Sequence, residues 1–416
     1  MSFSDFIGNT ETVQRLREML GLGHFPPAVI LAGADGSGKY TLALMLAQAM
    51  NCLERPLARK TGEVREEAAT GDLFAPPAAR AADDRVAFAA LKGSATQNLA
   101  PEKDGIIPGE LPDFCGHCAN CRRISLAADL EARCGEAVEA RENLRETDKK
   151  ETRIFVQTHP EVLVIPPDPP QMMIKVDQVR HVIQNIYFRP AEGREKVYIF
   201  TSSAFMKEAA NSLLKILEEP PEFATIFLLT TNPGELLPTI RSRAMTFTLG
   251  ALTPAEIEKQ LAKLRPDWDA RQRALVARLS EAAMGRALSW DLEAYVAARA
   301  QALVLLKSAL GKADHSELFK ATESFRPGAE GRKKMDELLR TLYLLLEDLM
   351  FLQSGTGQLV RNTDILGELK KMAEAADFGW VRRAAEGLGE VERGLRRNLL
   401  RSLSLDAFVA ALEPTM

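Results

Sequence analysis

Short apolar runs alternate with stretches of helical periodicity over the first 250 residues of the chain. Four segments contain short apolar runs, at 28–32, 159–166, 196–200 and 225–232. Runs of this length are typical of strands buried on both faces of a sheet. Apolar residues recur at helical spacing in the intervals, at 42–50, 174–186 and 206–219. This order predicts an α/β domain with a parallel sheet.

Helical patterns dominate both ends of the chain. Val13, Leu16 and Leu20 predict a short amphipathic helix within residues 2–24. Thr253, followed by Pro254, predicts a capped helix that opens a small helical domain over 250–297. Residues 298–416 are helical throughout, with a broad apolar face at 338–352 that suits a helix buried on several sides.

Two segments break the pattern of the α/β domain, which we expect to span residues 1–249. Residues 54–112 mix alanine, proline, glycine and charge without clear periodicity, which predicts an insertion that is partly helical or disordered. Residues 124–152 are dominated by Glu, Arg, Lys and Ala. They predict a second insertion, a solvated helix or helical hairpin.

The sequence Gly33-Ala-Asp-Gly-Ser-Gly-Lys39 follows the first apolar run and leads into a helix. Strand, glycine-rich turn and helix are the setting of a phosphate-binding P-loop, whose backbone N–H groups face an anion. The pattern requires a hydroxyl after the lysine to hold Mg²⁺, but Tyr40 stands there. Its phenol is too long and rigid, and Thr41 is one residue late and rotated by about 100° on the helix. Candidate nucleotide-binding residues are nevertheless Gly33, Gly36, Gly38, Lys39 and Thr41.

The apolar run at 196–200 ends in Thr201-Ser-Ser203. In P-loop ATPases the corresponding strand ends in acidic residues that hold Mg²⁺ and orient the attacking water. Hydroxyl groups do not supply that charge. With Tyr40, this is a second loss at the same metal site, so we predict that the chain does not hydrolyse ATP itself.

Three of the five cysteines are clustered in Cys115-Gly-His-Cys118-Ala-Asn-Cys121. A C-x2-C-x2-C run with one further cysteine supplies the four thiolates of a tetrahedral structural Zn²⁺ site. Cys52 is the preferred fourth ligand, with His117 and Cys134 as alternatives. Three unligated cysteines are the competing interpretation, and an iron–sulfur cluster would need a redox role that nothing else in the chain indicates.

Composition excludes several classes of protein. The net charge of −4 provides no global attraction to nucleic acid, so any contact with DNA requires a local patch or partner subunits. No apolar run approaches the roughly 20 residues that span a bilayer, and the N-terminus lacks the regions of a signal peptide. We therefore expect a cytoplasmic protein with no membrane contact.

Six motifs follow one another along the chain. They are Phe6-Ile-Gly-Asn9, the P-loop, the cysteine run, Asn211-x-Leu-Leu-Lys-x-Leu-Glu-Glu-Pro-Pro221, Thr230-Thr-Asn232 and Ile240-Arg-Ser-Arg243. This order resembles the bacterial clamp-loader AAA+ subunits, which are the gamma/tau and delta-prime subunits of DNA polymerase III. The resemblance covers residues 2–250 apart from the two insertions. It continues more weakly to Gly285-Arg-Ala-Leu288, which matches the second sensor segment of the family.

The resemblance implies an AAA+ P-loop domain at 1–249 with a zinc module, a helical lid at 250–297 and an oligomeric collar at 298–416. Gamma/tau subunits hydrolyse ATP and are expected to keep the hydroxyl and acids that this chain lacks, so the chain resembles the delta-prime type. Arg243 is then an arginine finger acting in trans, with Ala244 where the family has a cysteine. Arg286 joins the nucleotide-binding residues, with ATP or ADP bound weakly and without hydrolysis.

The implied partners are the gamma/tau and delta subunits, and through them the sliding clamp and primed DNA. The chain is then a component of the DNA polymerase III holoenzyme, a nucleotidyltransferase complex active in DNA replication. Two alternatives stay open. One is an active gamma/tau-type ATPase whose Mg²⁺ ligands are unidentified. The other is a zinc-dependent nucleic-acid-binding protein with a vestigial P-loop, although no aromatic residues cluster near the cysteines.

Overall fold

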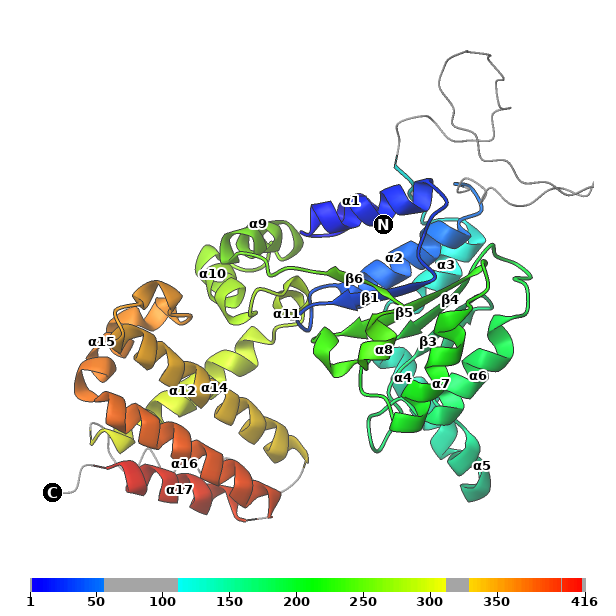
Figure 1. The fold of residues 1–416 in the computed structure, drawn as a ribbon. Coiled ribbons are helices and arrows are strands. Elements are labelled where there is room, and N and C mark those ends of the chain that lie inside the picture. The colour runs from blue at the N-terminus through cyan, green and yellow to red at the C-terminus, as the bar shows by residue number, and fades with distance from the viewer. Residues whose placement is uncertain (1, 56–110, 312–328, 398, 414–416) are drawn as a thin grey trace, which may run out of the picture. The chain divides into compact units, whose positions relative to one another are not determined.

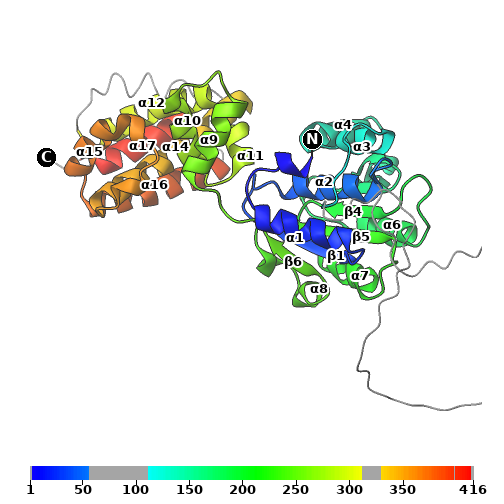
Figure 2. The same ribbon diagram turned by 90° about the horizontal axis from the view of Figure 1, so that it is seen from above.

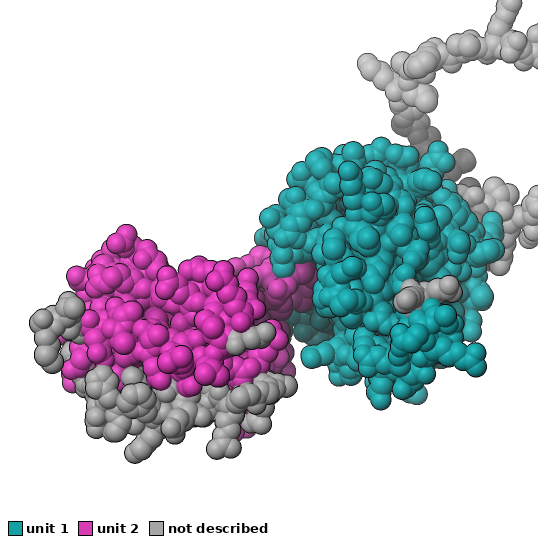
Figure 3. All heavy atoms as spheres, turned by 90° about the horizontal axis from the view of Figure 1, so that it is seen from below, with its two compact units in different colours: residues 1–32, 40–248 teal, residues 33–39, 249–416 magenta. Residues whose placement is uncertain are grey.

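A computed structural model describes residues 2–55, 111–311, 329–397 and 399–413 of the chain. The insertion predicted at 54–112 lies outside the described residues except at its two ends. Two compact units are present, one of residues 1–32 and 40–248 and one of residues 33–39 and 249–416 (Figure 3). Among the described residues, no helix has both the length and the apolar character needed to cross a membrane.

The first unit is built on a six-stranded sheet with the order β2-β3-β4-β5-β1-β6 (Figure 1). All neighbouring strands are parallel except β2 and β3. The strands are β1 (Ala28–Ala32), β2 (Val156–His159), β3 (Val162–Ile165), β4 (Lys196–Phe200), β5 (Ala224–Thr230) and β6 (Met245–Thr248). Every residue of β1, β3 and β5 is buried, as expected for strands covered on both faces.

Helices cover both faces of this sheet. Those of the first unit are α1 (Thr10–Gly21), α2 (Lys39–Asn51), α3 (Ala119–Ser125), α4 (Leu130–Glu142), α5 (Glu146–Glu151), α6 (Val176–Ile186), α7 (Lys207–Glu218) and α8 (Pro238–Arg241). Val179, Val182 and Ile186 of α6 pack with the buried side chains of α7 against the face that carries Ile30. Figure 1 shows α2 on the opposite face, where ten of its residues are buried. The second predicted insertion forms α4 and α5, and α4 buries none of its residues, as a solvated helix should.

Two element boundaries differ from the sequence prediction. The run at 159–166 is not one strand, because β2 ends at His159 and β3 begins at Val162. Pro160 stands in the turn between them, where its missing N–H costs no ladder bond. The N-terminal helix is shorter than residues 2–24, since Phe3–Asp5 form a separate 3-10 turn before α1.

The second unit is helical in its described part. Its helices are α9 (Pro254–Leu264), α10 (Ala270–Leu279), α11 (Met284–Leu288), α12 (Leu292–Ala309), α14 (Ala329–Gln353), α15 (Leu366–Ala375), α16 (Phe378–Arg396) and α17 (Arg401–Leu412) (Figures 1 and 2). Thr253 caps α9 in a capping box with Glu256. Helices α12 and α14 to α17 share one apolar core. The fold class predicted from the sequence, a parallel α/β sheet followed by helical structure, is confirmed.

The predicted division between lid and collar at 297 and 298 falls inside α12, which runs without a break from Leu292 to Ala309. A boundary there would cut a continuous helix.

Replacing Leu31 with alanine should loosen the sheet. Leu31 lies in β1 with none of its surface exposed, so its truncation should cost about 2–5 kcal/mol. Hydrogen–deuterium exchange in peptides of β1 and β5 should accelerate by at least about 30-fold, since 1.4 kcal/mol corresponds to a factor of ten. The matched variant Leu126→Ala, at an exposed leucine of the same unit, should leave this exchange unchanged. Equal effects of the two substitutions would contradict the assignment of β1 to the core.

Candidate functional site

The P-loop has the backbone shape that its glycines allow. Gly36 has a φ of +78°, and a Cβ added there would lie 2.7 Å from the backbone N of Arg286. Only glycine accommodates both the left-handed conformation and this close approach. The N–H of Gly285 donates to the carbonyl of Gly36 at 2.8 Å, so the loop is bonded directly to the start of α11. The second sensor segment therefore lies against the P-loop within the same unit.

The lysine of the P-loop is engaged by the loop itself. Its Nζ donates to the carbonyl oxygens of Gly33 at 2.6 Å and Ala34 at 2.8 Å, and Asp35 lies 3.8 Å away. The Lys39 side chain is only 11% exposed, and burial lowers the pKa of its ammonium, with Asp35 opposing and Arg286 adding to the shift. The donors that would reach a phosphate are thus already satisfied by carbonyl groups.

Tyr40 points away from a metal position at the P-loop. Its hydroxyl donates to the carbonyl of Ala127 at 2.6 Å, in the turn between α3 and α4. Burial raises the pKa of this phenol far above its usual value, with a further contribution from Cys134, so it stays a neutral donor. Thr41, one residue later on α2, is exposed. Neither side chain takes the place of the missing hydroxyl.

The carboxyl end of β4 carries hydroxyl groups, as the sequence indicated, but an acid lies beside them. Ser203 donates its Oγ proton to the carboxylate of Glu235, which stands in the 3-10 turn Pro233–Glu235 after β5. Sequence reasoning missed this contact because the two residues are far apart in the chain. Glu235 is exposed, so it faces solvent at this edge of the sheet.

Arg243 follows α8 at the surface of the first unit, with its side chain 35% exposed. One guanidinium nitrogen donates to the carbonyl of Thr239 at 3.0 Å, and another donates to Glu218 at 2.8 Å. Glu218 is the last residue of α7. The pair orients the guanidinium, but an exposed ion pair contributes only about 0–1 kcal/mol and exchanges readily for a stronger anion.

Arg286, the remaining predicted nucleotide contact, is paired within its own unit. Its guanidinium donates to the carboxylate of Glu281, in the turn before α11. This pair was not predicted, because Glu281 lies in a loop where no periodicity indicates a contact.

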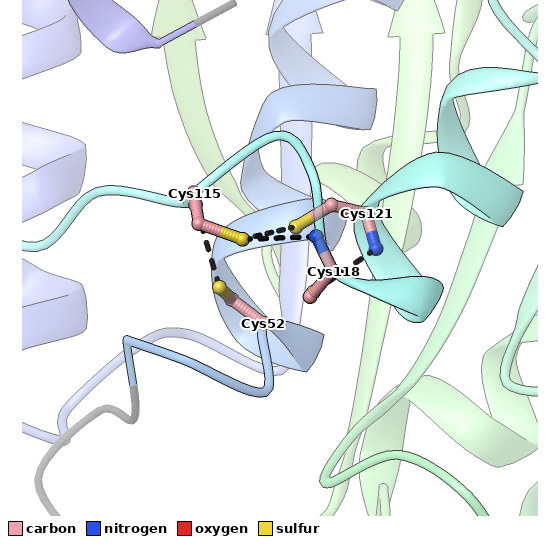
Figure 4. Close-up of side chains that lie close together, drawn as sticks. All are labelled: Cys52, Cys115, Cys118 and Cys121. Carbon is pink, nitrogen blue, oxygen red and sulfur yellow. Dashed lines mark hydrogen bonds between the residues drawn. The ribbon is translucent and has the colours of Figure 1, made fainter.

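Cys52, Cys115, Cys118 and Cys121 come together at the end of α2 (Figure 4). Their four Sγ atoms lie within 4.8 Å of one another, and those of Cys115 and Cys121 are 4.0 Å apart. Thiolates bound to one tetrahedral ion at about 2.3 Å would lie about 3.8 Å apart. The predicted set with Cys52 as the fourth ligand is therefore the set that the structure brings together. Cys134 lies outside this group in the described residues.

Backbone N–H groups point at the sulfur atoms of the cluster. The N–H of Cys115 donates to Cys52, that of Cys118 to Cys115 and that of Cys121 to Cys118, at 3.2–3.5 Å. Burial raises the pKa of Cys118, but the backbone N–H groups of Cys121 and Leu53 lower it more and leave it at about 7. At Cys118 these donors favour the thiolate, the form that binds metal, whereas burial raises the pKa of Cys115 and Cys121.

Polar contacts fix the cluster to the α/β core. Gln48 of α2 donates to the carbonyl of Cys121 at 2.9 Å, and Asn120 donates to the carbonyl of Asn51 at 3.1 Å. Arg194, just before β4, donates to the carbonyl of Cys52 at 2.8 Å. The cysteine cluster is thus continuous with the helix that begins at the P-loop lysine.

Comparison with known proteins identifies the relatives of this chain. Residues 108–253 match a family described as DNA polymerase III, delta subunit. The tau subunit of Escherichia coli DNA polymerase III is 26% identical over 329 residues, which are 78% of this chain and 38% of that protein. The Escherichia coli delta-prime subunit is 36% identical over 135 residues, which are 32% of this chain and 40% of that protein. The chain is thus similar to subunits of the DNA polymerase III clamp loader.

The predicted resemblance is therefore confirmed at the level of the family. The delta-prime type is not, because tau matches over a longer stretch and delta-prime with a higher identity. The chain spans only about two fifths of the length of either relative. A solved gamma subunit-related protein of Thermotoga maritima aligns over 61% of this chain and 82% of its own, at 22% identity and a TM-score of 0.30.

Replacing Gly285 with alanine should disturb the contact between α11 and the P-loop. The new methyl group would lie 2.8 Å from the carbonyl oxygen of Gly36 and 3.0 Å from its Cα. We expect a loss of stability of about 1–3 kcal/mol. All three tryptophans, at 268, 290 and 380, lie in the second unit, so their fluorescence during urea unfolding measures this change.

Gly367→Ala in α15 is the matched control, since a Cβ there meets nothing within 4 Å. It should be neutral or stabilise the unit by up to about 1 kcal/mol. If Gly285→Ala behaves like this control, the close approach of Gly36 and Gly285 is not a feature of the folded protein.

Proposed function

We propose that this chain is a delta-prime-type subunit of the DNA polymerase III clamp loader. In this role it helps to load the sliding clamp onto primed DNA, and its own nucleotide site does not hydrolyse ATP. The observation that carries the proposal is the hydrogen bond from Tyr40 to Ala127. It holds the residue after the P-loop lysine away from any metal, at the position where an ATPase needs a hydroxyl ligand.

Two further observations support a nucleotide site that does not hydrolyse ATP. Lys39 is satisfied by the carbonyl groups of its own loop. Phosphate binding would have to displace these contacts, which lowers affinity for ATP or ADP. Thr201, Ser202 and Ser203 replace the acidic residues of an active site, so Mg²⁺ and the attacking water lose their usual partners. Gly33, Gly36, Gly38 and Arg286 are then the residues of the second unit proposed to bind nucleotide weakly and without turnover, and Thr41 is the proposed contact from the first unit.

Arg243 is the residue proposed to act in catalysis, in trans. An arginine finger stabilises the charge that develops on the γ-phosphate of a neighbouring subunit. In this chain the guanidinium is exposed and already held in an anion-binding contact with Glu218. A phosphate carries more negative charge than a carboxylate, and its oxygen atoms can accept hydrogen bonds from two N–H groups of the planar guanidinium at once. It would therefore replace Glu218 as the partner of Arg243 on assembly.

The four-cysteine cluster is proposed to hold a structural Zn²⁺. Four sulfur donors, N–H bonds to three of them and burial of Cys52, Cys118 and Cys121 fit a closed site with no open position for water. Zinc there would fix the start of α3 to the end of α2. It would stabilise the fold and take no part in catalysis.

The proposed partners follow from the same assignment. They are gamma/tau and delta subunits in a hetero-oligomer, with residues 298–416 as the collar that joins them. The sliding clamp and primed DNA would be reached through this complex.

An active gamma/tau-type ATPase is the second candidate. Two observations favour it: the long match to tau and the carboxylate of Glu235 beside Ser203 at the end of β4. In that case Glu235 would supply the acid that the sequence lacks after β4.

ATP hydrolysis by the isolated chain separates the two candidates. We expect no Mg²⁺-dependent phosphate release above the level of a Lys39→Ala variant. Tyr40→Thr should not create activity, because the acids after β4 are still missing. Steady hydrolysis by the wild type that is lost in both Lys39→Ala and Glu235→Gln would identify an active ATPase and refute the delta-prime assignment.

Removing the proposed finger should slow ATP hydrolysis by the assembled complex. In a complex reconstituted with the partner subunits, Arg243→Ala should lower DNA-stimulated turnover at the neighbouring site by about 10³–10⁵-fold. Arg243→Lys should restore little of this turnover, since an ammonium group lacks the planar, paired N–H donors of a guanidinium. The exposed Arg241 lies two residues earlier, and Arg241→Ala serves as the matched control. Unchanged turnover with Arg243→Ala in an intact complex would refute the finger.

A further inference from the structure

A second group of metal-binding side chains lies beside the four cysteines. Glu54, Cys115 and His117 each place one ligand atom within 4.8 Å of the other two. The side chains of Glu54 and His117 are 50% and 62% exposed, whereas Cys52, Cys118 and Cys121 are buried. Cys115 is half-buried and belongs to both groups. The ligands therefore continue from the buried cluster out to the solvent.

The hydrogen bonds of His117 orient its ring for binding a cation. Nδ1 lies 3.0 Å from the carbonyl oxygen of Cys115, and because a carbonyl can only accept, Nδ1 carries the proton. Nε2 faces the carboxylate of Glu54, 3.0 Å away. A histidine that donates one N–H to a carbonyl and ligates through the other nitrogen is the usual arrangement at metal sites.

The distances are close to those that a single ion needs. Nitrogen and oxygen ligands lie at about 2.0–2.2 Å from Zn²⁺, so two of them on one tetrahedral ion are about 3.3–3.6 Å apart. The Nε2 to carboxylate distance is 3.0 Å, so the exposed side chains of Glu54 and His117 would move apart slightly to bind one ion. The Cys115 sulfur lies within reach of the same ion after a small side-chain adjustment, since a thiolate binds at about 2.3 Å.

We propose that Glu54, Cys115 and His117 form a second, exposed site for a divalent ion of the zinc type, with the Cys115 thiolate shared between the two sites. This inference rests on the proposed zinc in the four-cysteine cluster. A thiolate has lone pairs enough to bridge two ions, but donation to the first weakens its bond to the second. The outer ion is therefore bound more weakly, exchanges with solvent and has a coordination position open to water.

Titration of the untagged full chain with Co²⁺ as a spectroscopic substitute for zinc tests the proposal. The first equivalent should produce the thiolate-to-cobalt charge-transfer band of the four-cysteine site. A second equivalent should bind more weakly and alter that band, because it shares Cys115. Native mass spectrometry of the zinc-loaded chain should correspondingly show two ions.

His117→Asn and Glu54→Gln should each weaken the second step by more than about tenfold and leave the first step unchanged. His181→Asn, at an exposed histidine on α6, is the matched control and should change neither step. Binding of one equivalent alone by the wild type would overturn the proposal, as would a second step that survives both substitutions. Loss of the first step in His117→Asn would make His117 a ligand of the inner ion and would also overturn it. Absence of any first step in the wild type would instead refute the four-cysteine zinc site itself.

Discussion

The parallel pairing of β1 with β5 and β6 is the constraint on which the functional groups of the first unit depend. All five residues of β1 are buried and pair with β5, and Val29 to Ala32 also pair with β6, so the end of this strand is fixed where the P-loop begins. The parallel pairing of β4 with β5 places the ends of these two strands beside one another, with Ser203 and Glu235 in contact there. Because strand ends cannot shift without breaking ladder bonds, Tyr40 and Thr201 can differ from the residues of an active ATPase without altering the sheet.

The sequence predicted those parts of the site that depend on residue type and spacing. The C-x2-C-x2-C run and Cys52 lie together as expected. The sequence also shows directly that Tyr40 stands where the P-loop pattern has a hydroxyl for Mg²⁺. What the sequence did not reveal are the partners of the charged groups. Glu218 with Arg243, Glu281 with Arg286 and Glu54 with His117 are joined by tertiary folding or by irregular turns, where no periodicity signals a contact. The turn at Pro160 could have been predicted, since proline is excluded from a central strand.

The three basic residues that were proposed to contact a nucleotide are each paired with other groups of the same chain. Lys39 is held by carbonyl groups, Arg286 by Glu281 and Arg243 by Glu218. The three cations differ in what a phosphate would have to displace. For Lys39 it is a pair of short bonds in a largely buried setting, whereas for Arg243 it is one exposed ion pair. An anion presented from outside the chain therefore competes more easily for Arg243 than a nucleotide competes for Lys39.

The cysteine cluster joins two positions that are far apart in the chain. Cys52 and Cys115 lie on either side of residues 56–110, and Arg17 holds the carbonyl groups of Leu111 and Pro112 where the described chain resumes. The proposed zinc would fix both ends of the intervening segment whatever its length. The entropy of closing such a loop rises by only about 0.6 kcal/mol for each doubling of its length. A foreign domain inserted between Cys52 and Cys115 should therefore cost the sheet little stability.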